Sequence, residues 1–348
     1  MKKIFNLLLI SLLFLTLNGC KRYSEIHEIS FVLSMGLDYD PTNKLYEVSV
    51  YVINNANLTQ SDNQSIDTSS YIGIYKDQSI TEALKKITSN VDVTLELKHV
   101  KTIFINENFL TLENREYFYT FFKNGPLLYP SFEIYITPNK IEELFNVQVF
   151  EESTLYYTIL TGTKKAHTHE AVTFYEFVND ILIPDYYLGY PVISVSKDIF
   201  QNGEKEFQKT ENTGVMFFDE YANRHFLTYD EYPGMYLIHD FNNLLLKIDN
   251  IEFLVDNYNI EYTINKDNTI TFDINAEINY INSKEYDMYT YKDTLKKSIE
   301  KEITKLYQSC LKQDIDIFNI NYLRSLKKLD KIDLSSINFK YNINLLTP

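Results

Sequence analysis

The chain has 348 residues, of which 45% are hydrophobic and 15% aromatic, and its formal net charge is −15. This apolar content is sufficient for packed cores and argues against a wholly disordered chain. The acidic excess, with no basic stripe to offset it, argues against binding to nucleic-acid phosphates.

The first twenty residues have the layout of a secretory signal. A head with two lysines precedes an apolar run over residues 4–17, and this order of charge and apolar block is typical of such signals. The run is shorter than the roughly 20 apolar residues of a membrane-spanning helix. We therefore expect residues 1–19 to be a signal peptide that is removed. An ordinary cleaved signal without lipid and a short buried helix are the alternatives.

The end of this signal, Leu17-Asn18-Gly19-Cys20, resembles the lipobox of bacterial lipoproteins. The resemblance implies that a diacylglycerol joins the thiol of Cys20 and that cleavage makes Cys20 the new N-terminus. Two acyl chains are sufficient for stable anchoring, whereas the acidic body has no electrostatic attraction to anionic lipid. We expect Cys20 to be the lipidation site and to hold the chain at the membrane.

Strands and helices alternate in the first half of the chain. Ser79-Ile-Thr-Glu82 fits a capping box, which predicts that a helix begins there. The polar residues 54–70 are expected to form an exposed loop. The predicted strands are 30–37, 45–53, 71–75, 100–105, 132–137 and 190–195, and the predicted helices are 79–89, 106–123, 151–160 and 169–182.

A polar segment separates this half from the second. Residues 198–212 include the turn signal Asn202-Gly203, and we expect them to be a linker. The following strands are predicted at 213–218, 251–265, 269–281 and 337–345, and the helices at 231–239, 287–313 and 318–329. The whole pattern predicts an α+β fold with mixed sheets and packed helices. An N-terminal domain over 20–197, which can divide into two subdomains, precedes a C-terminal domain over 213–348 with a long hairpin and a long helix.

The nine glycines are too widely spaced for the common phosphate-binding loops. The closest two are eleven residues apart, so neither a P-loop nor a dinucleotide-binding fingerprint nor a nucleophile elbow can be built. No pair of carboxylates is marked as catalytic. We therefore expect no enzymatic activity and no cofactor. Cys310 lies in a helical pattern and is expected to be a buried free thiol.

Few other side chains are candidates for a site. His167-Thr-His169-Glu170 is the only cluster of histidines; it would need further ligands to hold a metal, so an exposed helix start is the expected role. Asp314 and Asp316 could ligate a cation, although a solvated helix exit is favoured. Tyr156-Tyr157 and Tyr186-Tyr187 could stack against a ligand, although aromatic residues more often pack in a core or at its rim.

Short segments along the chain carry a resemblance to a known family. They are Cys20 with Glu25-Ile26, Gly36-Leu-Asp38, the strand 46–54, Ser79-Ile-Thr-Glu-Ala-Leu84, His99-Val-Lys-Thr-Ile-Phe-Ile105, Thr213-Gly-Val-Met-Phe217 and Asp314-Ile-Asp-Ile-Phe318. Their order and spacing resemble the Ger(x)C family, the lipoprotein subunits of spore germinant receptors. The tryptophans that are usual in the family are absent, since the chain has no Trp.

This resemblance implies a non-catalytic subunit that is required for germination. It implies two multi-spanning membrane subunits as partners, a place at the outer face of the inner spore membrane, and an α+β fold in several domains. The principal alternative is an extracytoplasmic solute-binding lipoprotein of a transporter, which would need two similar lobes around a cleft. A surface-anchored hydrolase is a further alternative, but no motif favours it.

Overall fold

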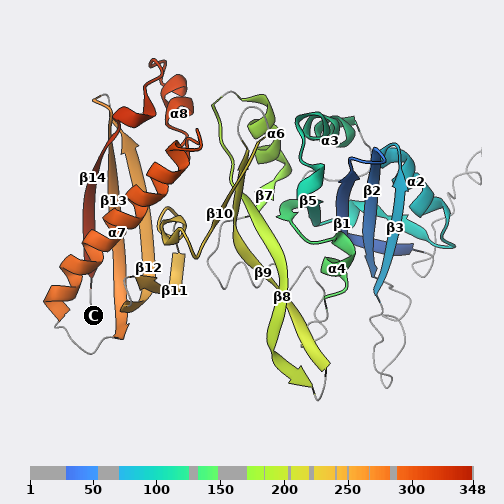
Figure 1. Ribbon diagram of the computed structural model, residues 1–348, viewed down its shortest axis with the longest axis horizontal. Helices are drawn as coiled ribbons and strands as arrows, with labels where there is room; N and C mark the ends of the chain where they lie inside the picture. Colours follow the sequence, from blue (N-terminus) through green and yellow to red (C-terminus); the bar gives the residue numbers. More distant parts are fainter. Residues whose placement is uncertain are drawn as a thin grey trace, which may run out of the picture.

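The computed structural model describes residues 29–53, 70–124, 132–147, 171–183, 185–202, 205–218, 223–239, 241–248, 251–265, 267–282 and 288–346. Within these ranges the chain forms a ten-stranded sheet and a four-stranded sheet, with helices against both (Figure 1). The predicted α+β class with mixed sheets is therefore confirmed. The signal peptide, Cys20, nearly all of the expected loop 54–70 and the expected helix 151–160 lie outside the described residues.

The first sheet contains antiparallel and parallel strands. Its strands are β1 (Ile29–Asp40), β2 (Leu45–Ile53), β3 (Ser70–Asp77), β4 (Thr94–Glu96), β5 (Thr102–Asn106), β6 (Glu133–Thr137), β7 (Val172–Thr173), β8 (Tyr190–Asn202), β9 (Lys205–Phe218) and β10 (Arg224–Thr228). The order in space is β10-β9-β8-β6-β5-β1-β2-β3, with β4 beside β1 and β7 beside β6. The Asp40 side chain accepts hydrogen bonds from the amides of Thr42 and Asn43, which forms the tight turn between β1 and β2.

Helices cover the two faces of this sheet. On one face lie α2 (Ile80–Ser89), α3 (Leu112–Asn124) and α6 (Phe174–Leu182), and their buried residues join the largest apolar cluster of the sheet. The rings of Phe118 in α3 and Phe177 in α6 meet edge to face, with centroids 4.8 Å apart. The short helix α4 (Ile141–Phe145) packs on the other face. This arrangement explains why β1, β5 and β6 are parallel, since helices connect them.

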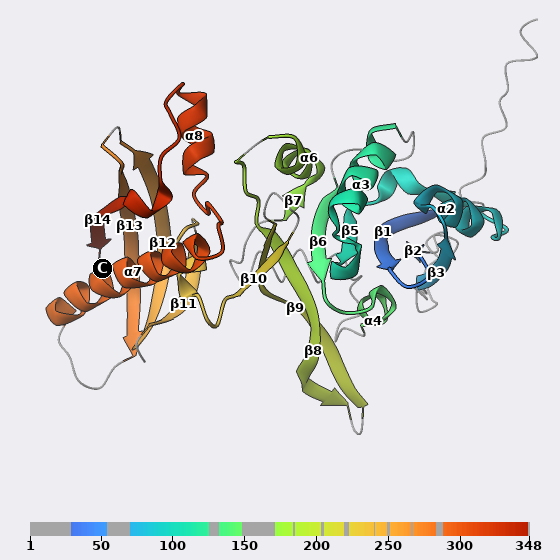
Figure 2. The same ribbon diagram turned by 45° about the horizontal axis from the view of Figure 1, so that its top comes forward.

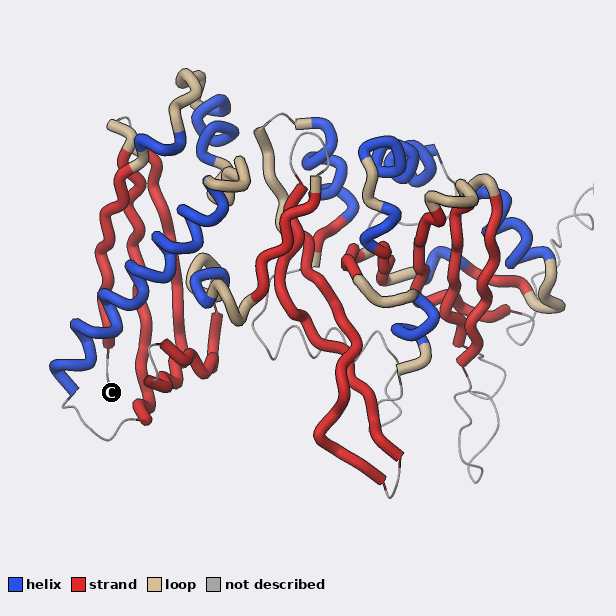
Figure 3. Tube along the Cα trace, viewed as in Figure 1, coloured by secondary structure: helices blue, strands red, loops and turns tan. Residues whose placement is uncertain are grey.

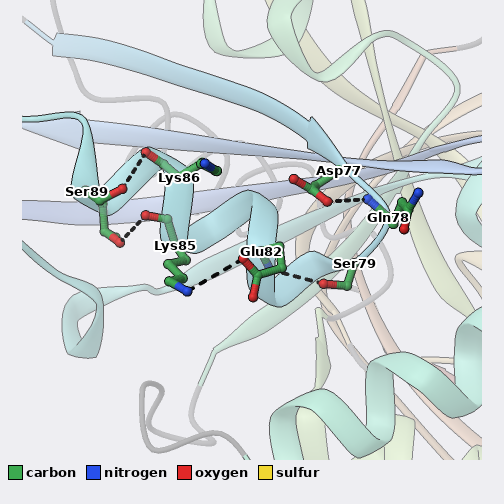
Figure 4. Close-up of polar contacts among 8 residues, drawn as sticks. Asp77, Gln78, Ser79, Glu82, Lys85, Lys86 and Ser89 are labelled. Carbon is green, nitrogen blue, oxygen red and sulfur yellow. Dashed lines mark hydrogen bonds and ion pairs between the residues drawn. The ribbon is translucent and has the colours of Figure 1, made fainter.

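The sequence correctly predicts the start of α2. The Ser79 Oγ accepts a hydrogen bond from the Glu82 amide at 3.1 Å, and the preceding Gln78 amide donates to Asp77 Oδ1 at 2.7 Å (Figure 4). The helix then buries Ala83, Leu84 and Ile87 against the sheet. The predicted helix 106–123 instead begins as the 3₁₀ turn η4 (Glu107–Phe109) and restarts as α3 at Leu112.

Strands β8 and β9 form a long hairpin. Residues 198–212 were expected to be a linker, but all of those described lie in these two strands, so that expectation is wrong. The far part of the hairpin extends as a two-stranded ribbon beyond the other strands (Figures 1 and 2). Two strands that pair beyond the rest of a sheet need no apolar residues for a core, so the polar sequence of residues 198–212 is compatible with strand structure. The division into domains at 20–197 and 213–348 stays a prediction, although β9 pairs with β8 and β10 in the first sheet.

The second sheet consists of β11 (Phe241–Ile248), β12 (Ile251–Ile264), β13 (Thr269–Asn282) and β14 (Asn338–Leu346). The long helix α7 (Met288–Leu311) crosses one of its faces (Figure 3). Between them, Phe272 and Ile274 of β13 pack with Ile299 and Ile303 of α7 in one apolar cluster. The connection through α7 and α8 (Ile320–Leu326) brings β14 back parallel to β13. The predicted hairpin of β12 and β13, helix α7 and the final strand are confirmed.

Some elements were not predicted. They are β4, β7, β10, β11 and the 3₁₀ turns η3 (Leu97–His99) and η6 (Leu334–Ser336). The helix expected at 231–239 is only the 3₁₀ turn η5 (Pro233–Met235). A proline followed by Gly234 explains this, since both residues disfavour the interior of an α-helix.

Replacement of Thr173 by alanine tests the local basis of α6. The Thr173 hydroxyl accepts from the Glu176 amide, and the Glu176 carboxylate accepts from the Thr173 amide at 2.7 Å, so the capping box is complete. We expect Thr173→Ala to lower the free energy of unfolding by about 1 kcal/mol, measured by chemical denaturation. Thr81→Ala, at an exposed position in α2, is the matched control and should change stability little. An equal loss in both variants would contradict the capping role.

Candidate functional site: the junction of the two sheets

Several candidate residues from the sequence lie near one another, where the two sheets meet. These are Tyr186-Tyr187, Cys310, Asp314 and Asp316. The other candidates, which are Cys20, His167-Thr-His169-Glu170 and Tyr156-Tyr157, lie outside the described residues. The junction has an apolar part and a polar part.

The apolar part is a cluster that joins the first sheet to α7. Its buried members are Val215 and Phe217 of β9, Leu227 of β10, Tyr229, Met235, Leu306 and Cys310 of α7, and Ile315. Cys310 is fully buried and free, which confirms the expectation from the sequence. Burial raises the pKa of the Cys310 thiol to about 12, so the thiol stays protonated at neutral pH and is a poor nucleophile.

The segment that connects the two sheets lies directly against α7. A Cβ atom on Gly234 would lie 2.5 Å from the carbonyl oxygen of Glu302 in α7, so this approach requires glycine. Close by, the Ser309 hydroxyl donates to the Tyr232 hydroxyl oxygen at 2.8 Å. His225 Nδ1 lies 3.1 Å from Gln313 Oε1. The connection between the sheets is thus held against α7 by the close approach at Gly234 and by polar contacts of residues that precede it.

The polar part is a clamp between the loop after α6 and the start of α8. The Tyr187 amide donates to Asn319 Oδ1 at 2.6 Å, and Asn319 Nδ2 donates to the Tyr187 carbonyl at 3.0 Å. This side-chain amide therefore binds the backbone as a neighbouring strand would. Asn319 has a φ of 49°, in the left-handed region that asparagine tolerates. Beside the clamp, the rings of Tyr186 and Tyr322 meet edge to face at 5.1 Å.

An ion pair reinforces the clamp at its exposed end. Lys331 Nζ lies 2.5 Å from Asp185 Oδ2, and the two side chains retain 65% and 29% of their exposure. Surface pairs of this kind contribute only about 0–1 kcal/mol. The two amide hydrogen bonds and the aromatic contact therefore contribute more to the clamp than this ion pair does.

A buried ion pair lies on the first-sheet side of the clamp. Arg115 of α3 and Asp180 of α6 form it, with 7% and 3% of their side chains exposed. Asp180 also accepts hydrogen bonds from the Tyr190 hydroxyl at 2.7 Å and the Leu188 amide at 3.2 Å. Burial raises the pKa of the Asp180 carboxyl, while the Arg115 charge and the two hydrogen bonds oppose that rise. The Arg115 guanidinium also lies over the Phe218 ring, 4.9 Å from its centroid.

A shallow cleft of about 230 Å³ lies over this ion pair. It is lined by Leu112, Arg115, Glu116, Asp180, Ile181, Leu182, Ile183, Asp185, Tyr186, Tyr187 and Phe218. Its volume is below the roughly 300–1,000 Å³ that is usual for ligand pockets. Tyr186 is engaged with Tyr322, and Tyr187 packs against the apolar cluster. Packing at a rim, the commoner use of such tyrosines, is what these two residues do.

Asp314 and Asp316 have structural roles at the exit of α7. Asp316 is buried, and its Oδ2 accepts a hydrogen bond from the Asn321 amide at 2.9 Å. Burial raises the pKa of the Asp316 carboxyl, and this hydrogen bond is among the contacts that oppose the rise. Asp314 has a φ of 55° where the chain leaves the helix. In the part of the chain that the structure describes, no group of three or more acidic, histidine or cysteine side chains could hold a metal ion.

The sequence analysis did not identify Arg115, Asp180 and Asn319. One signal was available for Asp180, because it lies three residues after Phe177 and therefore on the same buried face of α6. A charged residue on an apolar helix face requires a partner. Arg115 and Asn319 carry no such signal, since their partners are distant in sequence.

Along the described ranges, no helix combines the length and the apolarity needed to cross a bilayer.

Residues 22–195 match the model of a protein family described as the spore germination protein N-terminal domain. Among solved structures, the crystal structure of the GerBC protein is similar. The two chains are 14% identical with a TM-score of 0.44, and the match covers 91% of this chain and 98% of the other. No curated protein matches the chain.

Replacement of Asp180 by asparagine tests the buried ion pair. Asparagine keeps a carbonyl oxygen for Tyr190 and Leu188 but leaves the Arg115 charge buried without a counter-charge. Removal of one partner of such a pair costs about 3–5 kcal/mol, and we expect a loss of this size in the free energy of unfolding. The double variant Arg115→Met/Asp180→Leu removes both charges and should recover much of the loss. A single variant as stable as the wild type would contradict the role of the pair.

Proposed function

The chain belongs to the Ger(x)C family of spore germination proteins, and on this premise we propose that it is the lipoprotein subunit of a nutrient germinant receptor. The observation that carries the proposal is the family match over residues 22–195, which is half of the chain. The subunit acts without catalysis, through contact with two multi-spanning membrane subunits. It lies at the outer face of the inner spore membrane and helps to convert nutrient binding into germination.

The position of Cys20 supports attachment close to the membrane. The family match begins two residues after Cys20, and the first described strand begins at Ile29. Nine residues of extended chain reach at most about 30 Å. A lipid on Cys20 would therefore hold the first sheet within about 30 Å of the bilayer surface. This tether raises the effective concentration of the subunit near membrane-spanning partners.

The junction of the two sheets supports a role that depends on contact. An apolar cluster, a two-bond amide clamp and a glycine-dependent approach all connect the first sheet to α7 and α8. Because these links are short and mostly buried, a displacement imposed on one sheet is passed to the other. A subunit that lies between two membrane proteins could transmit their movements in this way.

The structure gives little support to a solute-binding lipoprotein of a transporter. That function would need two similar lobes around a cleft, whereas the two sheets differ in strand number and topology. The cleft over the ion pair of Arg115 and Asp180 is also small for a ligand pocket.

Replacement of Cys20 by alanine tests the anchor. Without a thiol no diacylglycerol can be attached, and no helix in the described residues could hold the chain in the bilayer instead. We expect the variant to move from the membrane fraction to the soluble fraction, or to remain unprocessed, as judged by fractionation and mass spectrometry. Gly19, Lys21 and the rest of the chain stay unchanged, and a Cys310→Ala variant is the matched control. A processed variant that stays fully in the membrane fraction would count against lipidation.

Deletion of the protein tests its role in germination. We expect the deletion strain to form normal spores that fail to respond to the nutrients of this receptor, because the receptor lacks one subunit. The same spores should germinate when a stimulus that bypasses nutrient receptors is used, and restoration of the wild-type chain should restore the response. A wild-type response to every nutrient, in a strain without a redundant receptor, would disprove the proposal.

A further inference from the structure

Strand β3 forms one edge of the ten-stranded sheet. It pairs with β2 over eight consecutive residues without a bulge, and no strand in the described ranges pairs with its other edge. Edge strands are usually protected from further pairing by shortness, a bulge, a proline or a free lysine. β3 contains neither bulge nor proline. Its one lysine, Lys76, is engaged with Glu47 at 2.8 Å. The usual protection of an edge is therefore weak here.

Large apolar side chains of β3 are exposed. The exposed fractions are 56% for Tyr71, 36% for Ile74 and 37% for Tyr75. Tyr71, Gly73 and Tyr75 are every second residue of the strand and therefore lie on the same face of the sheet. This face carries α2, because a Cβ atom on Gly73 would lie 3.2 Å from Ile87 Cγ2 of that helix. Ile74 lies on the opposite face. The edge thus presents apolar surface on both faces of the sheet.

The sequence of β3 is symmetric. Tyr71-Ile72-Gly73-Ile74-Tyr75 reads the same in both directions. In an antiparallel pair of two copies centred on Gly73, Tyr71 faces Tyr75, Ile72 faces Ile74, and Ser70 faces Lys76. The sequence numbers of two facing residues then differ by an even number. Because the N–H and C=O groups of a strand alternate between its two edges, both facing residues direct these groups to the same edge. An antiparallel ladder between the two copies requires this.

We infer that β3 pairs antiparallel with β3 of a second copy of this chain, on a two-fold axis at Gly73. The two ten-stranded sheets then continue across the interface. A two-fold axis of this kind makes a closed, isologous contact in which the same strand serves both partners. The inference goes beyond the proposed function, since neither lipidation nor germination enters the argument.

The pairing is favourable along the whole strand. Aromatic pairs such as Tyr71 with Tyr75 stabilise antiparallel ladders, the facing Ile72 and Ile74 add apolar contact, and no like charges face each other in this register. The symmetry favours a second copy over a strand of another protein, because a heterologous partner would require no palindrome. The net charge of −15 on each copy opposes association at low ionic strength.

A pair of cysteines tests the register. In the full chain with both Tyr71→Cys and Tyr75→Cys, each new thiol faces its counterpart on the second copy. The facing Cα atoms of an antiparallel pair lie about 4.5–5.5 Å apart, within the range that a disulfide bridges. Within one chain the two positions are about 13 Å apart along the strand, so no internal disulfide can form. Mild oxidation of the full chain should give a dimer band on a non-reducing gel, which reduction abolishes.

Three controls make the result specific. Tyr71→Cys alone and Tyr75→Cys alone place the thiols about 13 Å apart across the two-fold axis and should give no dimer band. Tyr175→Cys, at an exposed position of α6, reports random collision. Addition of Ile74→Lys to the double cysteine variant places a charge at the edge and should abolish the band. Resistance of all variants to limited proteolysis at the level of the wild type confirms that they fold.

Two outcomes would overturn the inference. One is a double variant that stays monomeric or that gives no more dimer than the single variants and Tyr175→Cys. The other is a cross-linked product that contains a different protein, which would assign the edge to a heterologous strand. The readout is a gel band and not germination, so failure here leaves the proposed function unaffected, and the reverse is also true.

Discussion

The buried ion pair of Arg115 and Asp180 determines how the central part of the molecule is assembled. Two charges are removed from water between helices that also pack through apolar side chains such as Phe118 and Phe177. Such burial is tolerated because the carboxylate also binds the Tyr190 hydroxyl and the Leu188 amide. These four groups come from α3, α6, the loop after α6 and β8. A change in the position of any one of them leaves a buried charge without one of its partners. The orientation of α3 and α6 on the sheet is therefore more tightly constrained than it would be by apolar contacts alone.

The position of the second sheet depends on the groups around Asp180. The loop that satisfies Asp180 through Leu188 also presents the Tyr187 backbone to Asn319 at the start of α8. One short loop therefore has a polar bond to Asp180, which is buried beside the first sheet, and another to Asn319 at the start of α8, which leads into the second sheet. On the far side of the junction, the apolar cluster around Leu306 and Cys310 completes the contact. The two parts of the chain are thus joined by an apolar surface that stabilises and by a few polar bonds that set the orientation.

The sequence predicted those parts of the fold that local patterns determine. The cap at Ser79, the alternation in β12 and β13 and the apolar stripe of α7 each depend on residues close together in the chain. The β8–β9 ribbon was mistaken for a linker because its sequence is polar. The candidate site was harder to predict, since Arg115 pairs with a residue 65 positions away and Asn319 with one 132 positions away. Tyr186-Tyr187 and Cys310 were identified, but as isolated residues. Their common location follows from tertiary contacts that no local period encodes.

The parallel pairing of β13 with β14 has a consequence for the order in which the chain folds. Ile274 pairs with Ile343, 69 residues further along the chain. The hairpin of β12 and β13 can form as soon as it is synthesised, but one edge of β13 then remains open until α7, α8 and β14 have followed. Loop closure over such a distance is slow compared with hairpin formation. Nascent chains of this protein therefore pass through a stage in which an apolar strand edge is unprotected, and this stage is where self-association and chaperone binding compete with folding.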